Sequence, residues 1–409
     1  MIAGPTAAEL RVALADQLAQ QGFLSDPGWR DAFAAVPREG FVPFYFEPCR
    51  GRPGWRLVEG GQEWLDGVYA DDALVTQING SDDAVEASRR NATVEGMPTS
   101  SSSAPSLMAA MLGVLDVYDG DRVLEIGTGT GYNAALLAHR LGDSNVTTVE
   151  VDPALSRRAR QALASAGHHP QVICGDGAVG VAAGEPYDRV ISTVALPCVP
   201  PAWLEQTREG ALILIPLSFA GHGGLMALLS RDDTGGASGR FLSQYGGFMA
   251  VRGTPEPTAP TIRPHLLETV RPTDVPPEAL NDGHPAAFYL SLRCPWPYKT
   301  IQFTPDEDRT TIQTWGQSTD GSTFALLHAN GITQVAAVGS LWDDIEAAYT
   351  EWHDLGRPER DRFGVTAGKR QSVWLNEPDH VITELRVPVT TEPPAERPVH
   401  TVTLQRGRY

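Results

Sequence analysis

Short apolar runs alternate with helical repeats of apolar residues through the middle of the chain. Each run is rich in Val, Leu and Ile, and apolar positions at three- and four-residue spacing follow it. The predicted strands are Val123–Ile126, Val146–Val149, Gln171–Cys174, Asp188–Thr193 and Ala211–Pro216, and the predicted helices include Tyr132–Leu141 and Pro153–Ala166. Strands that alternate with helices are typical of a parallel, doubly wound sheet, so we expect an α/β core.

The N-terminal region predicts two helices followed by irregular chain. Thr6 and Glu9 have the spacing of a capping box, and an apolar stripe at helical spacing follows until Gly22. A second, short helix is expected at Asp31–Val36. Residues 81–96 are polar and punctuated by Gly and Asn, which predicts a long loop.

The C-terminal region carries the signals of an added α+β domain. Residues 231–239 predict the tip of a hairpin and residues 253–264 a linker. Ser340 is expected to cap a helix whose apolar stripe runs from Leu341 to Leu355. Strands are expected at Ala287–Leu292, Ile332–Val338 and Ser372–Leu375, and a Pro-rich turn at Thr390–Pro398. The expected division is an N-terminal helical region with an insertion (1–99), a core (100–250) and an accessory α+β domain (265–409).

The charge balance limits the partners. With 32 basic and 50 acidic residues the formal net charge is −18, which repels the phosphates of nucleic acids. The sequence has no apolar run of about 18 residues, and its N-terminus lacks a basic segment followed by an apolar one. We therefore expect a cytoplasmic protein that binds neither nucleic acids nor membranes.

The cysteines give no sign of a metal or redox centre. They are far apart in the sequence, without the pairwise spacing of zinc ligands or of redox-active thiols. Cys49, Cys174, Cys198 and Cys294 are therefore expected to be buried free thiols, and no metal site is expected.

A glycine-rich turn joins the first core strand to its helix. Gly127, Gly129 and Gly131 allow a ligand to approach the main chain, whose unpaired amides can face it. The dinucleotide fingerprint requires glycine at the sixth position of this motif, where this chain has Tyr132. The loop therefore disfavours NAD, and a purely structural turn is the alternative.

Three acidic residues are expected at neighbouring strand ends. Glu125 is placed to meet the ammonium group of a ligand, Glu150 to accept both hydroxyls of a ribose, and Asp176 to meet an adenine amino group. Glu150 and Asp176 could instead be solvated strand-end charges, and Asp152 before Pro153 is typical of a helix start. Together the three acids suit the cationic cofactor S-adenosylmethionine better than a pyrophosphate. The expected cofactor contacts are Glu125, Gly127, Thr128, Gly129, Gly131, Tyr132, Asn133, Glu150, Val151, Asp176 and Gly177.

Several motifs resemble those of the protein-L-isoaspartate O-methyltransferases. They are VLEIGTGTGY at 123–132, GDG at 175–177, PYDRVI at 186–191, VPREGFVP at 36–43 and YADDAL at 69–74. The resemblance covers roughly residues 9–230. It implies a Rossmann-like class I methyltransferase fold, S-adenosylmethionine as cofactor and a carboxylate as acceptor.

The family places a Thr-x-Ser-x-Pro segment over the methyl group of the cofactor, and its serine is implicated in holding the acceptor. The matching stretch ends at Pro105, so the resemblance implies that Ser103 holds the acceptor, with Ser101 and Ser102 as neighbouring candidates. The chain departs from this pattern at three positions. Ser101 stands in place of the threonine and Ser102 in place of an apolar residue, and Ser106 stands where many relatives have histidine. A flexible serine-rich linker is the alternative.

The chain is longer than the compact repair enzymes of this family. Its serine-rich stretch, its Trp-rich insertion and residues 341–349 resemble actinobacterial methyltransferases encoded with ribosomally made peptides, such as graspetides and lanthipeptides. That resemblance implies methylation of an aspartate in a cyclised precursor peptide, whose ester then closes to an aspartimide. The alternatives are an isoaspartate repair methyltransferase, a small-molecule O-methyltransferase and a non-catalytic cofactor- or peptide-binding module. Methylation of a carboxylate needs no general base, because a carboxyl with a pKa of about 4 is already ionised at neutral pH.

Overall fold

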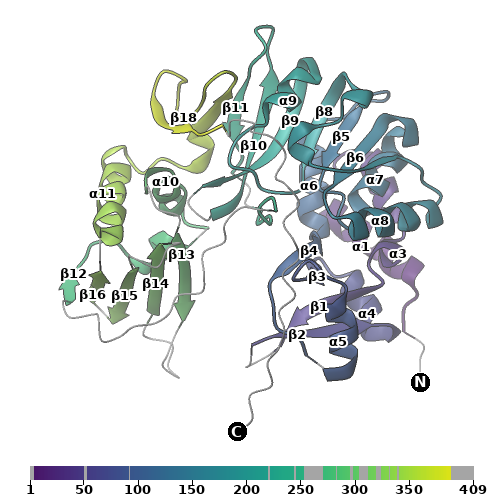
Figure 1. Cartoon of the computed structure of the whole chain (residues 1–409), viewed down its shortest axis with the longest axis horizontal. Helices are drawn as coiled ribbons and strands as arrows, with labels where there is room; N and C mark the ends of the chain where they lie inside the picture. The colour runs from purple at the N-terminus through teal and green to yellow at the C-terminus, as the bar shows by residue number, and fades with distance from the viewer. Residues whose placement is uncertain are drawn as a thin grey trace, which may run out of the picture.

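A ten-stranded sheet runs through the part of the chain that the computed structural model describes (Figure 1). The described residues are 4–49, 53–91, 93–219, 222–243, 246–252, 270–281, 283–294, 298–303, 312–318, 324–330, 332–338 and 340–387. The strand order is β19-β18-β17-β11-β10-β9-β8-β5-β6-β7. The parallel half comprises β5 (Val123–Ile126), β6 (Val146–Glu150), β7 (Gln171–Cys174), β8 (Tyr187–Ser192) and β9 (Thr207–Phe219), with α7 (Tyr132–Leu141), α8 (Pro153–Ser165) and the short α9 (Pro201–Glu205) between strands. The predicted strands and the doubly wound α/β core are confirmed.

The antiparallel half of this sheet combines two distant stretches of sequence. The hairpin of β10 (His222–Arg231) and β11 (Ala237–Phe241) turns where residues 231–239 predicted it. Strands β17 (Phe363–Ala367), β18 (Gln371–Leu375) and β19 (Val381–Leu385) then continue the sheet, because β17 pairs antiparallel with β11. The central sheet therefore does not end at the expected domain boundary near residue 265.

The N-terminal region forms helices and a small antiparallel sheet of order β2-β1-β3-β4. Its elements are α1 (Ala7–Gln20), α2 (Pro27–Ala35), α3 (Arg38–Phe41), β1 (Phe44–Pro48), β2 (Trp55–Glu59), α4 (Gly61–Val68), β3 (Leu74–Ile78), α5 (Asp83–Asn91), β4 (Pro98–Ser102) and α6 (Pro105–Leu115). The capping box of Thr6 and Glu9 is confirmed. Helix α2 begins earlier than predicted, because Asp26 caps it by accepting from the Gly28 amide.

One prediction for this region is wrong, and one alternative is ruled out. The loop expected at residues 81–96 contains α5, whose Val85 packs against Phe46 and Ile78 of the small sheet. The polar sequence of α5 shows no apolar stripe, and the helix is stabilised by the tertiary packing of Val85 and Ala84. The alternative of a flexible serine-rich linker is ruled out, since Ser101 and Ser102 belong to β4.

The remaining C-terminal elements form a five-stranded sheet and two helices. The sheet has the order β12-β16-β15-β14-β13, from β12 (Val270–Pro272), β13 (Tyr298–Phe303), β14 (Ile312–Ser318), β15 (Phe324–Asn330) and β16 (Ile332–Val338). Helices α10 (Pro285–Arg293) and α11 (Leu341–Asp354) lie between this sheet and the central one (Figure 1). The strand predicted at Ala287–Leu292 is wrong, because these residues belong to α10. The apolar pattern of so short a run does not distinguish a buried helix from a strand. Ser340 precedes α11 as expected, but its side chain makes no capping bond. The predictions for residues 253–264 and 390–398 lie outside the described residues.

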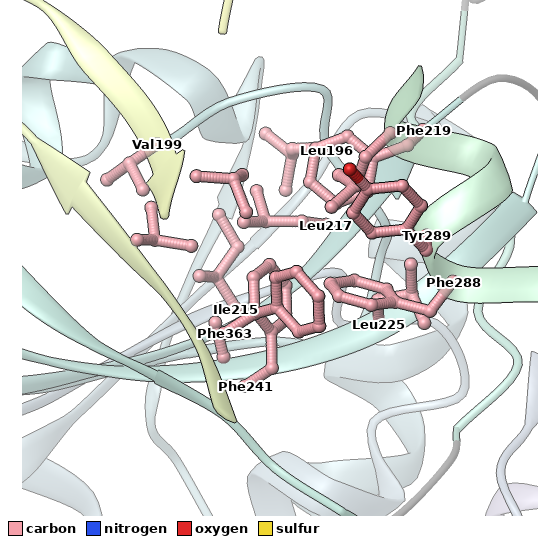
Figure 2. Close-up of a cluster of buried hydrophobic side chains, with 14 of the residues drawn as sticks. Leu196, Val199, Ile215, Leu217, Phe219, Leu225, Phe241, Phe288, Tyr289 and Phe363 are labelled. Carbon is pink, nitrogen blue, oxygen red and sulfur yellow. The ribbon is translucent and has the colours of Figure 1, made fainter. Parts of the chain in front are cut away.

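An aromatic cluster fastens α10 to the central sheet (Figure 2). The ring of Phe288 in α10 lies 4.9 Å, centroid to centroid, from both Phe241 of β11 and Phe363 of β17. All three side chains are buried, in the same apolar core as Leu124 and Ile126 of β5. The core that supports the glycine loop is therefore continuous with that of the C-terminal region.

The cysteines differ in part from expectation. Cys198 and Cys294 are buried and Cys49 is half-buried, but Cys174 is exposed, because it ends the edge strand β7. No three His, Cys, Asp or Glu side chains among the described residues are grouped so that they could hold a metal ion. No helix in the described ranges is long and apolar enough to cross a membrane.

Candidate cofactor and acceptor site

The glycine loop lies at the carboxyl end of β5 and is fixed by backbone contacts. Gly127 has φ +94°, and a Cβ at this position would lie 2.6 Å from the Thr193 hydroxyl oxygen and 2.9 Å from Val194. Gly131 has φ +90°, and a Cβ there would meet Ala159 at 3.2 Å. The amides of Gly127 and Thr128 both donate to the carbonyl of Val149, at 2.9 and 3.1 Å. Larger residues at these positions would clash or be strained, so the loop requires glycine.

Glu125 lies beneath this loop with no exposed surface. Its carboxylate accepts from Asn133 Nδ2 and from the Thr148 hydroxyl, both at 2.6 Å. Burial raises the pKa of this carboxyl to about 7, although the two hydrogen bonds oppose the shift. A buried Glu125 offers no direct contact to a ligand. Its carboxylate instead orients Asn133, which lines the cavity described below. The Oδ1 atom of Asn133 has no hydrogen-bond partner among the described residues.

Glu150 ends the neighbouring strand and fastens the glycine loop. One oxygen of its carboxylate accepts from the Gly129 amide at 2.9 Å, and the other from the Asp152 amide at 3.0 Å. The next residue, Val151, is 46% exposed. Since β6 is adjacent to β5, this places a carboxylate and an apolar side chain beside the loop.

Asp176 follows the third of these parallel strands and is exposed. It accepts from the Ala178 amide at 2.9 Å, at the start of a 3₁₀ turn. A Cβ on Gly177 would lie 2.5 Å from Ile126, so this turn packs tightly against β5. Val179 in the same turn is 59% exposed. The strand ends of β5, β6 and β7 therefore lie in order along one edge, as the sequence predicted.

A small cavity separates the glycine loop from the serine strand β4. Its lining includes Ser101, Ser102 and Ser103 from the serine stretch and residues 127–130 of the glycine loop. The other lining residues are Met108, Met111, Tyr132, Asn133, Ile191 and Thr193. Of the residues predicted from the sequence, the three serines and Gly127, Thr128, Gly129, Tyr132 and Asn133 meet here. Gly131, Glu125, Glu150, Val151, Asp176 and Gly177 are not among the lining residues.

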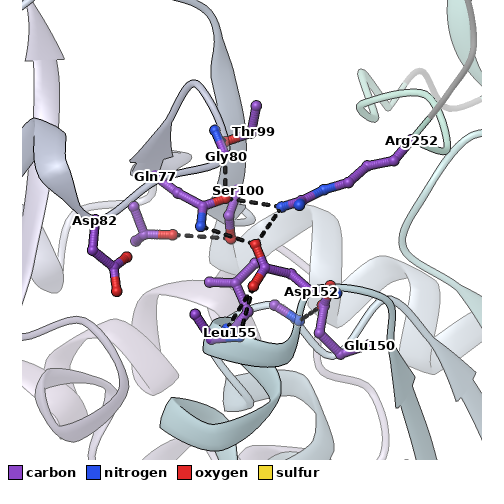
Figure 3. A network of polar contacts seen from close by, with 12 residues as sticks. Gln77, Gly80, Asp82, Thr99, Ser100, Glu150, Asp152, Leu155 and Arg252 are labelled. Atoms are coloured by element: carbon purple, nitrogen blue, oxygen red, sulfur yellow. Dashed lines mark hydrogen bonds and ion pairs between the residues drawn. The ribbon is translucent and has the colours of Figure 1, made fainter. Parts of the chain in front are cut away.

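A polar network joins the serine strand to the end of β6 (Figure 3). Asp152 caps α8 by accepting from the amides of Ala154 and Leu155, as expected of a helix start. Its other oxygen accepts from Gln77 Nε2 of β3 at 3.1 Å and forms an ion pair with Arg252 at 2.9 Å. Arg252 also donates to Gln77 Oε1 at 2.9 Å.

The sequence gave no reason to single out Gln77 or Arg252. The segment that contains Arg252 pairs with the chain just after β8. The Ala195 amide donates to the carbonyl of Met249, and the Val251 amide donates to the carbonyl of Ala195. In the sheet, β5 lies between β8 and β6. Residues 249–252, called the strap below, therefore link the strand ends on either side of β5 and its glycine loop.

The sequence comparisons with known proteins point to one family. Residues 85–241 match the family model described as protein-L-isoaspartate(D-aspartate) O-methyltransferase. The chain is 36% identical over 160 residues to protein-L-isoaspartate O-methyltransferase 2 of Archaeoglobus fulgidus, a match that covers 37% of this chain and 72% of that protein. It is 32% identical over 209 residues to the enzyme of Methanothermobacter thermautotrophicus, covering 51% of this chain and 79% of the relative. The match to the enzyme of Ignicoccus hospitalis, at 41% identity, spans only 56% of that relative and 28% of this chain.

A solved protein-L-isoaspartate O-methyltransferase has a similar fold. It aligns with a TM-score of 0.51 at 21% sequence identity, and the alignment covers 90% of this chain and all of that one. Because 90% of the chain is aligned, the similarity extends past the core into the C-terminal region. The architecture is thus a class I methyltransferase fold with an added C-terminal region.

Proposed function

Because this chain belongs to the protein-L-isoaspartate O-methyltransferase family, a family of S-adenosylmethionine-dependent carboxyl methyltransferases, we propose that it methylates a carboxylate of a peptide or protein. The proposed acceptor is the free carboxylate of an L-isoaspartyl residue. One observation carries the proposal: a single cavity is lined both by the glycine loop and by Ser101, Ser102 and Ser103 at the end of β4. This cavity brings the expected cofactor loop and the expected acceptor residues together.

The residues around the glycine loop fit S-adenosylmethionine, which would supply the methyl group. Asn133 Oδ1 is a buried acceptor without a partner among the described residues, suited to the ammonium group. Glu150 would accept from the ribose hydroxyls and Asp176 from the adenine amino group. The exposed Val151 and Val179 would cover the adenine faces, since exposed apolar side chains near such a turn gain from contact with a flat ring.

The acceptor side requires positioning, not proton transfer. An ionised carboxylate needs no base, so the protein has to hold one oxygen in line with the S–CH3 bond and exclude water. We propose that the Ser103 hydroxyl, which makes no hydrogen bond with a described residue, donates to the acceptor, with Ser101 and Ser102 as neighbouring candidates.

Replacement of Ser103 tests this assignment. Ser103→Ala should lower the rate of methyl transfer about tenfold or more, because one hydrogen bond to a charged acceptor is lost. Cofactor affinity should stay within about threefold, since the residue faces the acceptor. Radiolabel transfer to an L-isoaspartyl peptide and calorimetry with S-adenosylhomocysteine would measure the two. Ser100→Ala is the matched control, because Ser100 lies in β4, just before the cavity-lining serines, but does not line the cavity itself. Equal activity of Ser103→Ala and the parent would move the role to Ser101 or Ser102.

A second candidate is the tailoring of an aspartate in a cyclised, ribosomally made precursor peptide, with closure of the ester to an aspartimide. The observation that favours it is the folded region after residue 270, which lies outside residues 85–241 that the family model matches. Against it, the solved structure of similar fold aligns over 90% of this chain. In this reading the C-terminal region is an accessory domain that recognises the peptide.

One comparison of substrates distinguishes the two candidates. The full chain would be given a linear L-isoaspartyl peptide, a linear aspartyl peptide and a cyclised aspartyl peptide of the same composition. Mass spectrometry would follow the gain of a methyl group and the later loss of methanol. Preference for the isoaspartyl peptide supports the first candidate, and preference for the cyclised aspartyl peptide the second. Cofactor binding without methylation of any carboxyl peptide would contradict both.

A further inference from the structure

Arg38 is a fully buried cation next to the acceptor side of the cavity. The residue has 0% exposed surface, and burial lowers the pKa of its guanidinium to about 10, so it stays charged at neutral pH. It begins the short helix α3, within the VPREGFVP stretch. The sequence suggested no role for it beyond the family resemblance.

The guanidinium joins two segments through neutral oxygens. One end nitrogen donates to the carbonyls of Val68 and Ala70, at 2.8 and 3.1 Å. The other donates to the carbonyl of Asp72 at 3.1 Å, and to the serine strand as described next. Arg38 makes no ion pair with a carboxylate of the described residues. The carboxylates of Asp71 and Asp72 act on the guanidinium charge without pairing with it directly and raise its pKa, but the effect of burial is larger. A buried charge without a direct partner is costly, and carbonyl dipoles offset only part of that cost.

The second end nitrogen reaches the wall of the cavity. It donates to the carbonyl of Ser103 at 3.0 Å and to the hydroxyl oxygen of Ser102 at 3.4 Å. The guanidinium carbon also lies 5.8 Å from the ring centroid of Tyr132. All three contacted residues line the cavity, so the positive charge lies directly behind its acceptor wall.

The hydrogen bond from Arg38 determines the direction in which the Ser102 hydroxyl can donate. Ser102 is 2% exposed, and its oxygen accepts from Arg38. Its own hydrogen makes no hydrogen bond with a described residue and is free to point into the cavity. A hydroxyl whose oxygen accepts from a cation is a better donor, because hydrogen bonds in a chain polarise one another.

We propose that Arg38 is a specificity-determining residue, which makes the cavity favour an anionic carboxylate over a neutral carboxamide. It does so through its charge and through the Ser102 hydroxyl. In a chain of net charge −18, a local positive charge is needed for an anionic acceptor to approach. A bound carboxylate would add a countercharge on the cavity side of the guanidinium, in addition to the carboxylates of Asp71 and Asp72. This inference rests on the proposed carboxyl methylation.

The test compares two peptides that differ at the acceptor group. The full chain, with S-adenosylhomocysteine bound, would be titrated with an L-isoaspartyl peptide and with the same peptide carrying a carboxamide in place of the acceptor carboxylate. The parent should bind the carboxylate peptide about tenfold to a hundredfold more tightly. Arg38→Met should bring this ratio close to one, while Arg38→Lys should keep most of it. Affinity for S-adenosylhomocysteine should change less than about threefold.

A matched control separates charge from architecture. Arg189 is also buried and binds the carbonyls of Leu115 and Asp116, but it pairs with Asp121 and does not line or contact the cavity. Arg189→Lys should lower stability without changing the carboxylate-to-carboxamide ratio. If Arg38→Met weakens both peptides equally, Arg38 only holds the chain together and the inference is overturned.

Ser102→Ala keeps the test decisive if the Arg38 variants do not fold. This change leaves the four carbonyl contacts of Arg38 in place and removes the polarised hydroxyl. The ratio should fall several-fold, and an unchanged ratio overturns the inference. The parent tests the premise separately: failure to methylate any carboxyl peptide overturns the proposed function, whereas an active parent with unaltered ratios in the variants overturns only the role of Arg38.

Discussion

Glu150 fixes the glycine loop and is also the proposed ligand of the ribose hydroxyls. Its carboxylate already fixes the amides of Gly129 and Asp152. Hydrogen bonds from ribose hydroxyls would add to these contacts, because a carboxylate has about four acceptor sites. The residue is 6% exposed, so its bonds are shielded from competing water.

Removal of this carboxylate should weaken cofactor binding. Glu150→Ala loses the ribose contact, about 1.5–3 kcal/mol, and also frees the Gly129 amide, so affinity should fall about 10–100-fold. Calorimetry with S-adenosylhomocysteine would measure it. The control is Asp232→Ala, because Asp232 also accepts from backbone amides, at Thr234 and Gly236 in the β10–β11 turn. Unchanged affinity in Glu150→Ala would remove Glu150 from the site.

Glu125 should make stability depend on pH. Burial raises the pKa of its carboxyl from 4.5 to about 7. Between these values the folded protein keeps a proton that the unfolded chain releases, so the free energy of unfolding falls as pH rises through this window. The loss is up to about 3 kcal/mol. Glu125→Gln cannot ionise, so urea unfolding at about pH 5 and pH 7.5 should show a smaller loss in the variant. The same loss in both proteins would contradict the titration of Glu125.

At the scale of elements, the strap of residues 249–252 connects parts that are remote in sequence. Gln77 and Arg252 are 175 residues apart, yet both contact Asp152. Asp152 in turn donates its amide to Glu150. The strap, β3 and the start of α8 therefore share one polar network beside the glycine loop.

Loss of the strap contact should affect the cofactor more than stability. Arg252 is 38% exposed in its side chain, so its ion pair contributes about 1 kcal/mol or less. Arg252→Gln should raise the dissociation constant of S-adenosylhomocysteine about threefold, because Asp152 and Glu150 are less well fixed. Arg293→Gln removes a comparable ion pair, to Glu351 at 2.8 Å between α10 and α11, and should leave this constant unchanged. Equal effects of the two changes would contradict a local role of the strap.

At the scale of the whole molecule, one apolar core extends from the glycine loop to the C-terminal helices. Phe288 of α10 packs between β11 and β17, and Ile126 beside the loop belongs to the same cluster. A chain that ends near residue 250 would expose the edge of β11 and the buried Phe241. Such a truncation would disturb folding as well as any recognition of the acceptor.

A point substitution in this core tests the continuity directly. Phe288→Ala should lower the free energy of unfolding by about 3–5 kcal/mol, because it leaves a cavity among buried aromatic rings. If the core is one unit, tryptophan fluorescence and S-adenosylhomocysteine binding should be lost at the same urea concentration. Separate transitions would show that the C-terminal region unfolds on its own and would support the domain boundary near residue 265.

The sequence by itself determined the parallel strands, the glycine loop and the order of the acids along the strand ends. These depend on local signals: β5, β7 and the capped α1 follow from apolar period, glycine position and capping residues. The tertiary structure alone decided the rest. It buried Glu125, turned the run at 287–292 into α10, and brought Arg38, Gln77 and Arg252 to the site. The contacts of these two arginines and one glutamine join residues from 30 to 175 positions apart, and no local pattern encodes a partner at such a distance.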